Sequence, residues 1–489
     1  MTPVLRQYQV EVIDAVRDLF TQGYRRVLLV APTGAGKTVM AADLIRRLRA
    51  SGQHILFLAG ARELIFQTSA KLADIDVEYG IIMAGVRERV ADVQVASVQT
   101  LARRDQMPVA HVIFIDEADL ARAKTYEKIL AFYPDALVIG MTGTPWRSDG
   151  KGLGELFQAS VVAATPRALM DAGFLVDFDA VSFVPLDLGG VKSTAGDYDA
   201  EEQGRRATKT EDGKRLAGDI VREYTARAAG RRAVCFAVTI EHSKMLAEQF
   251  VAAGVPAEHL DGEMPADDRA AIIARLRAGT THVVCNVGVL TRGVDIPPIE
   301  VVILARATKS LSLFLQMVGR GLRPCAGKTR ALILDHAGCI VKQSGGDVEP
   351  VHGFPDDERD YSLTADEKKR AKTTNVVRIT QCRACFSVIR SGPETCPSCG
   401  AVLAKPRAEV SLETVAGRAI EGQELRRATA APNPVHVVAI RDLIWMAQDR
   451  GWKPAAVAMK FKAEFHIFPN KALLDAGRRA AGIRTAEAA

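Results

Sequence analysis

The chain has 489 residues, of which 48% are hydrophobic and 25% are charged, and its formal net charge is +6. These values are typical of a soluble globular protein with two or three domains, and they exclude a small scaffold held by disulfides. No apolar run approaches the roughly 18 residues that cross a bilayer, and the N-terminus lacks the basic-then-apolar pattern of a signal peptide. We therefore expect a cytoplasmic protein with no membrane partner.

A phosphate-binding loop is predicted near the N-terminus. The apolar run Val27–Val30 leads into a loop of small residues, which is followed by an amphipathic stretch at Val39–Arg49. Strand, loop and helix in this order place backbone N–H groups around phosphate, with Lys37 on the β and γ oxygens and the Thr38 hydroxyl on Mg²⁺. Ala31 replaces the usual first glycine, which is tolerated if that residue has a negative φ. The nucleotide-binding residues predicted here are Pro32, Thr33, Gly34, Ala35, Gly36, Lys37 and Thr38.

Short apolar runs alternate with helical patterns over two parts of the chain, which is typical of parallel sheets flanked by helices. The rhythm lapses between Leu186 and Gly213 and then resumes, so two α/β domains are expected. The runs read as strands are Val27–Val30, Ile55–Ala59, Val93–Ser97, Val112–Ile115 and Ala136–Gly140, then Ala233–Ala237, Val283–Asn286, Val301–Ala305 and Ala331–Asp335.

Two adjacent carboxylates, Asp116 and Glu117, follow the apolar run that ends at Ile115. Ligands of α/β sheets bind at the carboxyl ends of strands, so Asp116 is predicted to hold Mg²⁺ and Glu117 to polarise the water that attacks the γ-phosphate. An acidic helix cap is the competing interpretation, and the phosphate loop upstream disfavours it.

Arginines end an amphipathic stretch in the second α/β domain. Arg320 and Arg323 are three residues apart, and glycines on both sides of Arg320 keep the backbone slim, so the arginines could be presented to a γ-phosphate across a domain cleft. Taken alone, the same arginines would be an ordinary solvated basic face.

Four of the eight cysteines form two C-x-x-C pairs. This spacing predicts a structural Zn²⁺ site with tetrahedral thiolate ligands, whereas a redox role would need only one pair. The remaining cysteines are scattered and are expected to be buried thiols. The predicted ligands are Cys382, Cys385, Cys396 and Cys399.

The C-terminal part is basic and helical. Residues 401–489 hold 14 Lys and Arg against 9 Asp and Glu, and helices are expected over 435–450 and from Pro454 to about Phe465. Phe461 and Phe465 share one helical face, which favours core packing over stacking on nucleic acid. The basic residues could still contact a polyanion.

In their order, these segments resemble the superfamily 2 helicases over residues 5–338. The resemblance implies two tandem RecA-like domains that bind ATP and Mg²⁺ between them and nucleic acid across them. It also implies that Arg6 and Gln9 recognise adenine, that Gly293 and Asp295 line the ATP cleft, that Gln316 places the attacking water, and that Arg320 and Arg323 are arginine fingers. The residues expected to contact nucleic acid are Arg62, Gln67, Gln99, Thr100, Thr239 and Thr291.

The letters Asp-Glu-Ala-Asp at 116–119 suggest an RNA-remodelling DEAD-box protein, but that subgroup usually has Ser-Ala-Thr where this chain has Thr142-Gly143-Thr144. The chain looks more like the branch of superfamily 2 that acts on DNA. Within that branch it looks most like the RadD-like bacterial and phage DNA-repair helicases, which also carry cysteine pairs after the motor. An ATP-dependent DNA helicase or translocase in repair, recombination or replication is expected, with a repair or replication protein as a partner of the zinc module or tail. An RNA remodeller and a nucleotide-dependent clamp that recruits partners stay as alternatives.

The expected fold class is α/β, with two RecA-like domains, a small zinc ribbon and a short helical C-terminal region. The expected boundaries are 1–165 for the ATP-binding domain, 166–213 for an inter-domain connection, 214–342 for the second domain, 343–376 for a charged linker or surface-wrapping segment, 377–404 for the ribbon, 405–434 for a flexible linker and 435–489 for a basic helical tail.

Overall fold

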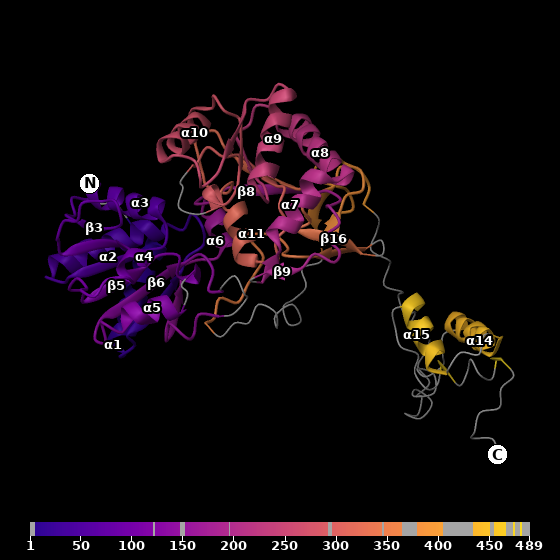
Figure 1. Ribbon diagram of the computed structural model, residues 1–489, viewed down its shortest axis with the longest axis horizontal. Coiled ribbons are helices and arrows are strands. Elements are labelled where there is room, and N and C mark those ends of the chain that lie inside the picture. Colours follow the sequence, from indigo (N-terminus) through magenta and orange to yellow (C-terminus); the bar gives the residue numbers. More distant parts are fainter. Residues whose placement is uncertain are drawn as a thin grey trace, which may run out of the picture. The chain divides into compact units, whose positions relative to one another are not determined.

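The computed structural model describes residues 5–120, 123–146, 152–194, 196–291, 296–344, 347–363, 379–403, 434–449, 454–465, 473–474 and 480–481. Contacts divide the chain into two units, Met1–Ala404 and Lys405–Ala489. Within the first unit, two parallel sheets with flanking helices follow one another along the chain (Figure 1). The predicted α/β class and the two RecA-like sheets are therefore confirmed.

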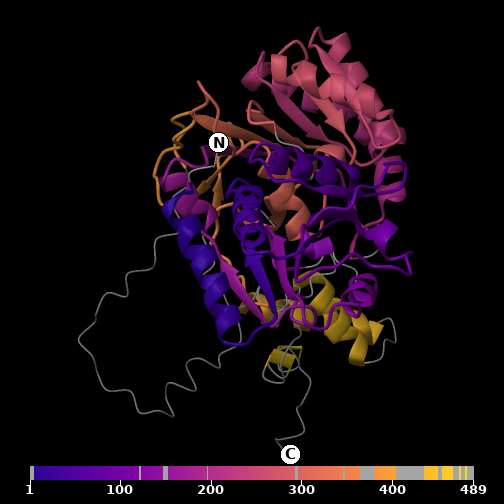
Figure 2. The same ribbon diagram turned by 90° about the vertical axis from the view of Figure 1, so that its left-hand side faces the viewer.

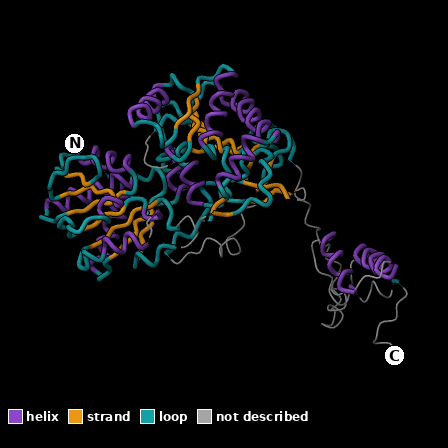
Figure 3. The backbone as a smooth tube through the Cα atoms, viewed as in Figure 1, coloured by secondary structure: helices purple, strands orange, loops and turns teal. Residues whose placement is uncertain are grey.

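The first sheet has the strand order β3-β4-β2-β5-β6-β1-β7, and all of its neighbouring strands are parallel. Its central strands are buried along their length, because helices cover both faces (Figure 3). The strands are β1 (Arg26–Val30), β2 (Ile55–Ala59), β3 (Gly80–Ile82), β4 (Val93–Ser97), β5 (Val112–Ile115), β6 (Leu137–Thr142) and β7 (Ala159–Val162).

Strands β1, β6 and β5 are neighbours in this sheet. Their carboxyl ends therefore meet at one edge, and the phosphate loop, the Asp116–Glu117 pair and the turn after Thr142 all start there. In Figure 2 the first sheet is nearer to the viewer than the second. The helices around the first sheet are α1 (Gln7–Thr21), α2 (Lys37–Ala50), α3 (Arg62–Ala73), α4 (Val98–Leu101), α5 (Ala123–Leu130) and α6 (Pro166–Asp171), with a 3₁₀ turn η1 (Ala118–Leu120).

The second sheet has the order β12-β13-β11-β14-β15-β8-β19-β18. Its first six strands are parallel, whereas β19 and β18 are antiparallel additions at one edge. The strands are β8 (Asp177–Ser182), β11 (Ala233–Phe236), β12 (Ala257–Leu260), β13 (Val283–Asn286), β14 (Val301–Leu304), β15 (Arg330–Asp335), β18 (Ile379–Gln381) and β19 (Ser387–Arg390).

Part of the expected inter-domain connection, 166–213, is built into the second domain. Strand β8 pairs with β15 over its whole length, and the polar stretch after it forms a short hairpin and a helix. The elements from here to the arginine motif are β9 (Ser193–Thr194), β10 (Asp197–Tyr198), α7 (Ala200–Lys209), α8 (Glu211–Ala228), α9 (Ile240–Ala252), α10 (Ala266–Ala278), a 3₁₀ turn η2 (Val289–Thr291) and α11 (Leu311–Val318).

The segment expected to be a charged linker, 343–376, is ordered over its described first half. A hairpin of β16 (Val341–Ser344) and β17 (Asp347–Pro350) is followed by a segment whose Phe354, Asp356 and Tyr361 side chains are buried. Phe354 and Tyr361 belong to a buried hydrophobic cluster of the first unit, and residues 364–376 lie outside the described residues.

The second unit contains a pair of helices, α14 (Pro434–Asp449) and α15 (Pro454–Phe465), as the helical pattern predicted. Phe461 is fully buried in a small core with Ile440 and Val457, which confirms the core interpretation for that residue. Trp445 is 47% exposed and lies under the Arg441 guanidinium. In the described part of the chain, every helix is too short or too polar to cross a membrane.

Because the protein buries histidines in their neutral form, we predict that mild acid destabilises it. Burial lowers the pKa of His242 to about 4 and that of His336 to about 3. In the unfolded chain both rings take up a proton near pH 6.5, so the unfolded state binds more protons as the pH falls below that value. Burial also lowers the pKa of His352 to about 4, which adds to this effect, whereas burial raises the pKa values of the Asp116 and Asp335 carboxyls, which opposes it. With three such rings against two such carboxyls, the free energy of unfolding should drop by about 1 kcal/mol between pH 6 and pH 5.

Urea unfolding at a series of pH values measures this drop. The control is His336→Phe, which keeps the stacking of residue 336 on Phe183, whose ring centroid lies 4.2 Å from that of His336. It should lose the part of the pH dependence that comes from the His336 ring. Equal stability at pH 7 and pH 5 in the wild type would contradict the prediction.

Candidate active site and zinc-binding site

The phosphate loop joins β1 to α2 at the shared sheet edge. Lys37 is the first residue of α2 and Thr38 the second, so both side chains start at the positive end of the helix dipole. Gly36 precedes the helix with φ +82°, and a Cβ there would lie 2.4 Å from Gln9 Nε2, so only glycine fits. Ala31 is not among the residues with positive φ, which is the condition under which it can replace glycine.

The carboxylates after β5 face this loop. Glu117 is buried, and its Oε1 lies 3.5 Å from Lys37 Nζ. Glu117 has φ +46°, a left-handed conformation that is unusual for glutamate and that clusters at functional sites. Asp116 accepts a hydrogen bond from the Glu117 backbone N–H at 2.9 Å. Burial and the Glu117 carboxylate raise the pKa of Asp116 to about 7, so protons compete with a cation there below neutral pH.

The predicted adenine-recognition residues pack on the other side of the loop. Gln9 is buried, and its Nε2 donates to the Ala35 carbonyl at 3.1 Å, which the Tyr8 hydroxyl also contacts at 2.7 Å. The Arg6 guanidinium lies 3.7 Å from the ring centroid of Phe174. Phe174 follows α6 and no motif marks it in the sequence, so it could be found only from the fold.

Helix α11 of the second domain forms the facing wall of the cleft. A Cβ on Gly319, directly after α11, would lie 2.8 Å from Thr33 Cβ, so glycine at this position allows the second domain to touch the phosphate loop. The Gln316 side chain is buried, and its Nε2 lies 3.4 Å from Ser312 Oγ.

A buried hydrogen-bond network joins the two domains beside this contact. Asp119 accepts from Thr142 Oγ1 at 2.9 Å and from Ser312 Oγ at 3.1 Å, and Thr144 Oγ1 donates to Ser312 Oγ at 2.8 Å. The sequence gives Asp119, Thr144 and Ser312 no separate signal, because the network forms only when a turn of one domain meets a helix of the other.

The two predicted arginine fingers follow α11. Arg320 is 5% exposed, and its Nη2 donates to the Thr291 carbonyl at 2.9 Å. Arg323 is half-buried, and its backbone carbonyl accepts a hydrogen bond from Lys328 Nζ at 2.8 Å. Gly293 and Asp295, the other residues expected at the cleft, lie outside the described residues.

The cleft is closed in this conformation. Pro32, Thr33, Gly143, Thr144, Gln316 and Gly319 are among the residues that line a cavity of about 30 Å³. Pockets for small molecules usually measure about 300–1,000 Å³. This cavity is therefore too small to hold a nucleotide, and residues of both domains are in close contact around it.

The nucleic-acid residues predicted in the first domain come together at the starts of α3 and α4. Gln99 Nε2 donates to the Gly60 carbonyl at 3.0 Å, and Thr100 Oγ1 accepts from a backbone N–H at 3.3 Å. Arg62 is exposed and lies over the Phe66 ring, and Gln67 is half-buried one turn further along α3.

In the second domain the two corresponding residues make different contacts. Thr291 is buried at the arginine motif, whereas Thr239 caps α9 by accepting from the His242 backbone N–H at 3.2 Å. Helix α7 packs on Thr239, and an open groove of about 510 Å³ lies beside it. Lysine, arginine, aspartate and glutamate all line this groove, so it lacks the excess of positive charge expected of a groove that binds the phosphates of a nucleic acid.

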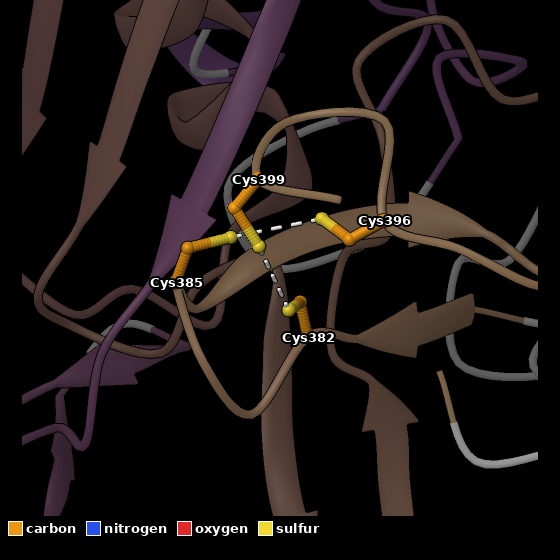
Figure 4. Close-up of side chains that lie close together, drawn as sticks. All are labelled: Cys382, Cys385, Cys396 and Cys399. Atoms are coloured by element: carbon orange, nitrogen blue, oxygen red, sulfur yellow. Dashed lines mark hydrogen bonds between the residues drawn. The ribbon is translucent and has the colours of Figure 1, made fainter. Parts of the chain in front are cut away.

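The four cysteines of the C-x-x-C pairs converge, as predicted (Figure 4). Their sulfurs all lie within 4.8 Å of one another, and the pairs Cys382–Cys399 and Cys385–Cys396 are each 3.7 Å apart. Tetrahedral zinc with Zn–S bonds of about 2.3 Å places its sulfurs at about this separation. The cluster therefore fits a structural Zn²⁺ ion with no open coordination position.

The ribbon that carries these cysteines is joined to the motor. Strand β19 pairs with β8 of the second sheet through Ser387 and Val388, so the ribbon extends that sheet. Arg390 of the ribbon lies 2.7 Å from both Asp356 and Asp357, so its guanidinium is held in two ion pairs. Arg383, in the turn between the first two cysteines of the ribbon, is exposed.

Metal content tests the zinc assignment. We expect the purified protein to contain one zinc per chain by elemental analysis, and Cys396→Ser to lose it because three thiolates leave the site open. The control is Cys325→Ser, since Cys325 lies outside the cluster. Full zinc in the Cys396→Ser variant, or iron in the wild type, would contradict the assignment.

Two family models match the two sheets. The model described as "Type III restriction enzyme, res subunit" matches residues 2–147, and the helicase conserved C-terminal domain matches residues 217–325. They cover the first sheet up to Trp146 and the second domain from α8 to the arginine motif.

Relatives extend this match over most of the chain. A 51.5 kDa protein of a Lactococcus phage is 30% identical over 382 residues, which are 76% of this chain and 77% of that protein. The candidate ATP-dependent helicase IRC3 of Saccharomyces cerevisiae is 32% identical over 363 residues, which are 69% of this chain but only 52% of the yeast protein.

A solved structure shares the fold. The ATP-dependent Type ISP restriction-modification enzyme LlaBIII, bound to DNA, superimposes with a TM-score of 0.50 and 18% identity, over 68% of this chain and 27% of that one. Together with the family models and relatives, the cleft geometry leads to one conclusion. The chain belongs to the superfamily 2 helicases, a family of nucleic-acid-dependent ATPases.

Proposed function

We propose that this protein is a DNA-dependent ATPase that uses ATP hydrolysis to move along or remodel DNA during repair, recombination or replication in the cytoplasm. One observation carries the proposal: the contact of Gly319 with Thr33 brings the wall that holds Gln316 and Arg320 against the wall that holds Lys37 and Glu117. A site split in this way can couple hydrolysis to domain movement.

In the proposed reaction, Glu117 orients and polarises a water for in-line attack on the γ-phosphate. Lys37, Arg320 and Arg323 neutralise the charge that develops on the phosphate oxygens, and Gln316 helps to place the water. Thr38 and Asp116 would hold Mg²⁺, which would supply further neutralisation of the phosphate charge. Arg6 and Gln9 hold the adenine end of the nucleotide.

DNA is favoured over RNA by three features. One family model is described as a restriction enzyme subunit, and the fold relative is described as bound to DNA. The turn after β6 reads Thr142-Gly143-Thr144, in place of the Ser-Ala-Thr usual in RNA-remodelling DEAD-box proteins. The cysteine pairs that follow the motor further favour a RadD-like DNA-repair role. Arg62, Gln67, Gln99, Thr100, Thr239 and Thr291 are the proposed DNA contacts.

Displacement of the third strand from a DNA triplex tests movement directly, because a translocating motor removes that strand without having to unwind the duplex. We expect displacement that requires ATP and that a non-hydrolysable analogue does not support. A nucleotide-dependent clamp would bind forked DNA in the presence of ATP and displace nothing, which would overturn the translocase proposal.

A further inference from the structure

A segment after β17 crosses the ATP cleft and reaches both of its walls. This segment, residues His352–Leu363, is called the strap here, and neither family model includes it. Its Phe354 and Tyr361 side chains belong to the same buried cluster as Trp146 of the first domain and Phe314 of the second. The strap is therefore packed into the motor.

The start of the strap is fixed to the wall that carries the arginines. The His352 ring stacks on Phe314 of α11 with 5.1 Å between ring centroids, and its Nε2 lies 2.9 Å from the Thr308 carbonyl oxygen. Arg359 donates to the His352 carbonyl at 3.2 Å, which holds the turn in shape. The start of the strap is therefore in direct contact with α11.

The end of the strap is fixed to the wall that carries the phosphate loop. The Tyr361 ring stacks on Trp146 with 5.5 Å between ring centroids and 24° between their planes. Trp146 comes two residues after Thr144, whose hydroxyl belongs to the network that joins the domains. Between the two ends, Pro355 and Tyr361 line the same small cavity as Thr33 and Gly319.

The middle of the strap is held by the zinc ribbon. Arg390 of β19 donates to Asp356 from Nη2 and to Asp357 from Nη1, each at 2.7 Å, and its guanidinium lies 4.8 Å from the Phe354 ring centroid. The Asp356 side chain is only 3% exposed and is also paired with Arg167 at 3.3 Å. Removing Arg390 would leave a buried carboxylate with one weaker partner, which is costly.

We propose that the strap is a positioning element of the ATP site and that the zinc ribbon, acting through Arg390, holds it there. The ribbon thereby sets how the arginine wall meets the phosphate loop when the cleft closes for hydrolysis. Arg390, Asp356 and Tyr361 act through other residues and do not touch nucleotide. The inference rests on the proposed ATPase activity, and it assigns the ribbon a role in positioning the ATP site.

ATP hydrolysis by single variants in the full chain tests the proposal. Arg390→Ala should lower the DNA-stimulated kcat about tenfold while the KM for ATP changes less than threefold, because closure and not nucleotide contact is disturbed. Arg390→Lys should recover part of the loss, since an ammonium cannot hold both carboxylates as the guanidinium fork does. The control is Arg383→Ala, an exposed arginine of the same ribbon that should keep the wild-type kcat.

Hydrogen exchange in the absence of nucleotide gives a second readout, which does not depend on the ATPase. In Arg390→Ala, exchange should speed up in the strap and also in residues 142–146, while the zinc content stays at one per chain. An Arg390→Ala protein with wild-type kcat or with unchanged exchange in both segments would overturn the inference, as would an equal loss in Arg383→Ala. Failure of the wild type to hydrolyse ATP would instead reject the proposed function.

Discussion

Replacing Glu117 by glutamine is expected to lower kcat for ATP hydrolysis by about 10²–10⁴-fold while ATP still binds. The amide keeps the shape of the side chain, but it cannot polarise the attacking water. The position of Glu117, buried in a left-handed conformation with its carboxylate 3.5 Å from Lys37 Nζ, leaves little freedom for another group to take its place. Steady-state hydrolysis and binding of a fluorescent ATP analogue separate the two effects.

Two further variants sharpen this test. Lys37→Ala should lose both binding and hydrolysis, because the lysine contacts the β and γ oxygens in the ground state as well as during transfer. Glu88→Gln is the matched control, since it makes the same chemical change in an exposed pair with Arg104, away from the cleft. A Glu117→Gln protein that hydrolysed ATP at the wild-type rate would remove the proposed mechanism.

The second large effect is expected at Arg320. Arg320→Ala should lower kcat by about 10²–10³-fold with a smaller change in KM, because the charge it meets develops on the γ-phosphate during the reaction. The guanidinium is already placed by its hydrogen bond to the Thr291 carbonyl. Arg320→Lys should stay impaired, because an ammonium cannot make that bond and reach the phosphate at once.

Because Arg320 is buried, the variant's folding needs its own measurement. Its thermal midpoint and its binding of ATP should be compared with those of Arg215→Ala, which removes an exposed arginine of the same domain. A folded Arg320→Ala protein with wild-type kcat would exclude the arginine-finger role and would leave Arg323 as the remaining candidate.

The parts of the fold that depend on local pattern could be predicted. Strand β1, the phosphate loop and α2 follow one another within 25 residues, and the β5 strand ends at its carboxylates, so short windows of sequence carry the signal. The cysteine pairs are equally local, and their sulfurs converge as the spacing predicts. Phe461 was placed in a core by helical periodicity alone.

The parts that depend on distant pairing could not be predicted. Strand β8 belongs to the second sheet because it pairs with β15, about 150 residues later in the chain. Strand β19 then pairs with the other side of β8. In the sequence Asp119 is only the last residue of the Asp-Glu-Ala-Asp run, and its bond to Ser312 depends on the approach of the other domain. In the sequence the strap resembles a charged linker. Its acidic residues pair with Arg390, which lies on another element, so a short window of sequence does not show the pairing.

Hydrolysis of ATP measured side by side with no polymer, single-stranded DNA, duplex DNA, forked DNA and RNA tests the central claim most directly. We predict a low basal rate that at least one form of DNA raises by tenfold or more and that RNA raises far less. Stimulation by RNA alone would identify an RNA remodeller, and a rate that no polymer changes would contradict a nucleic-acid-driven motor.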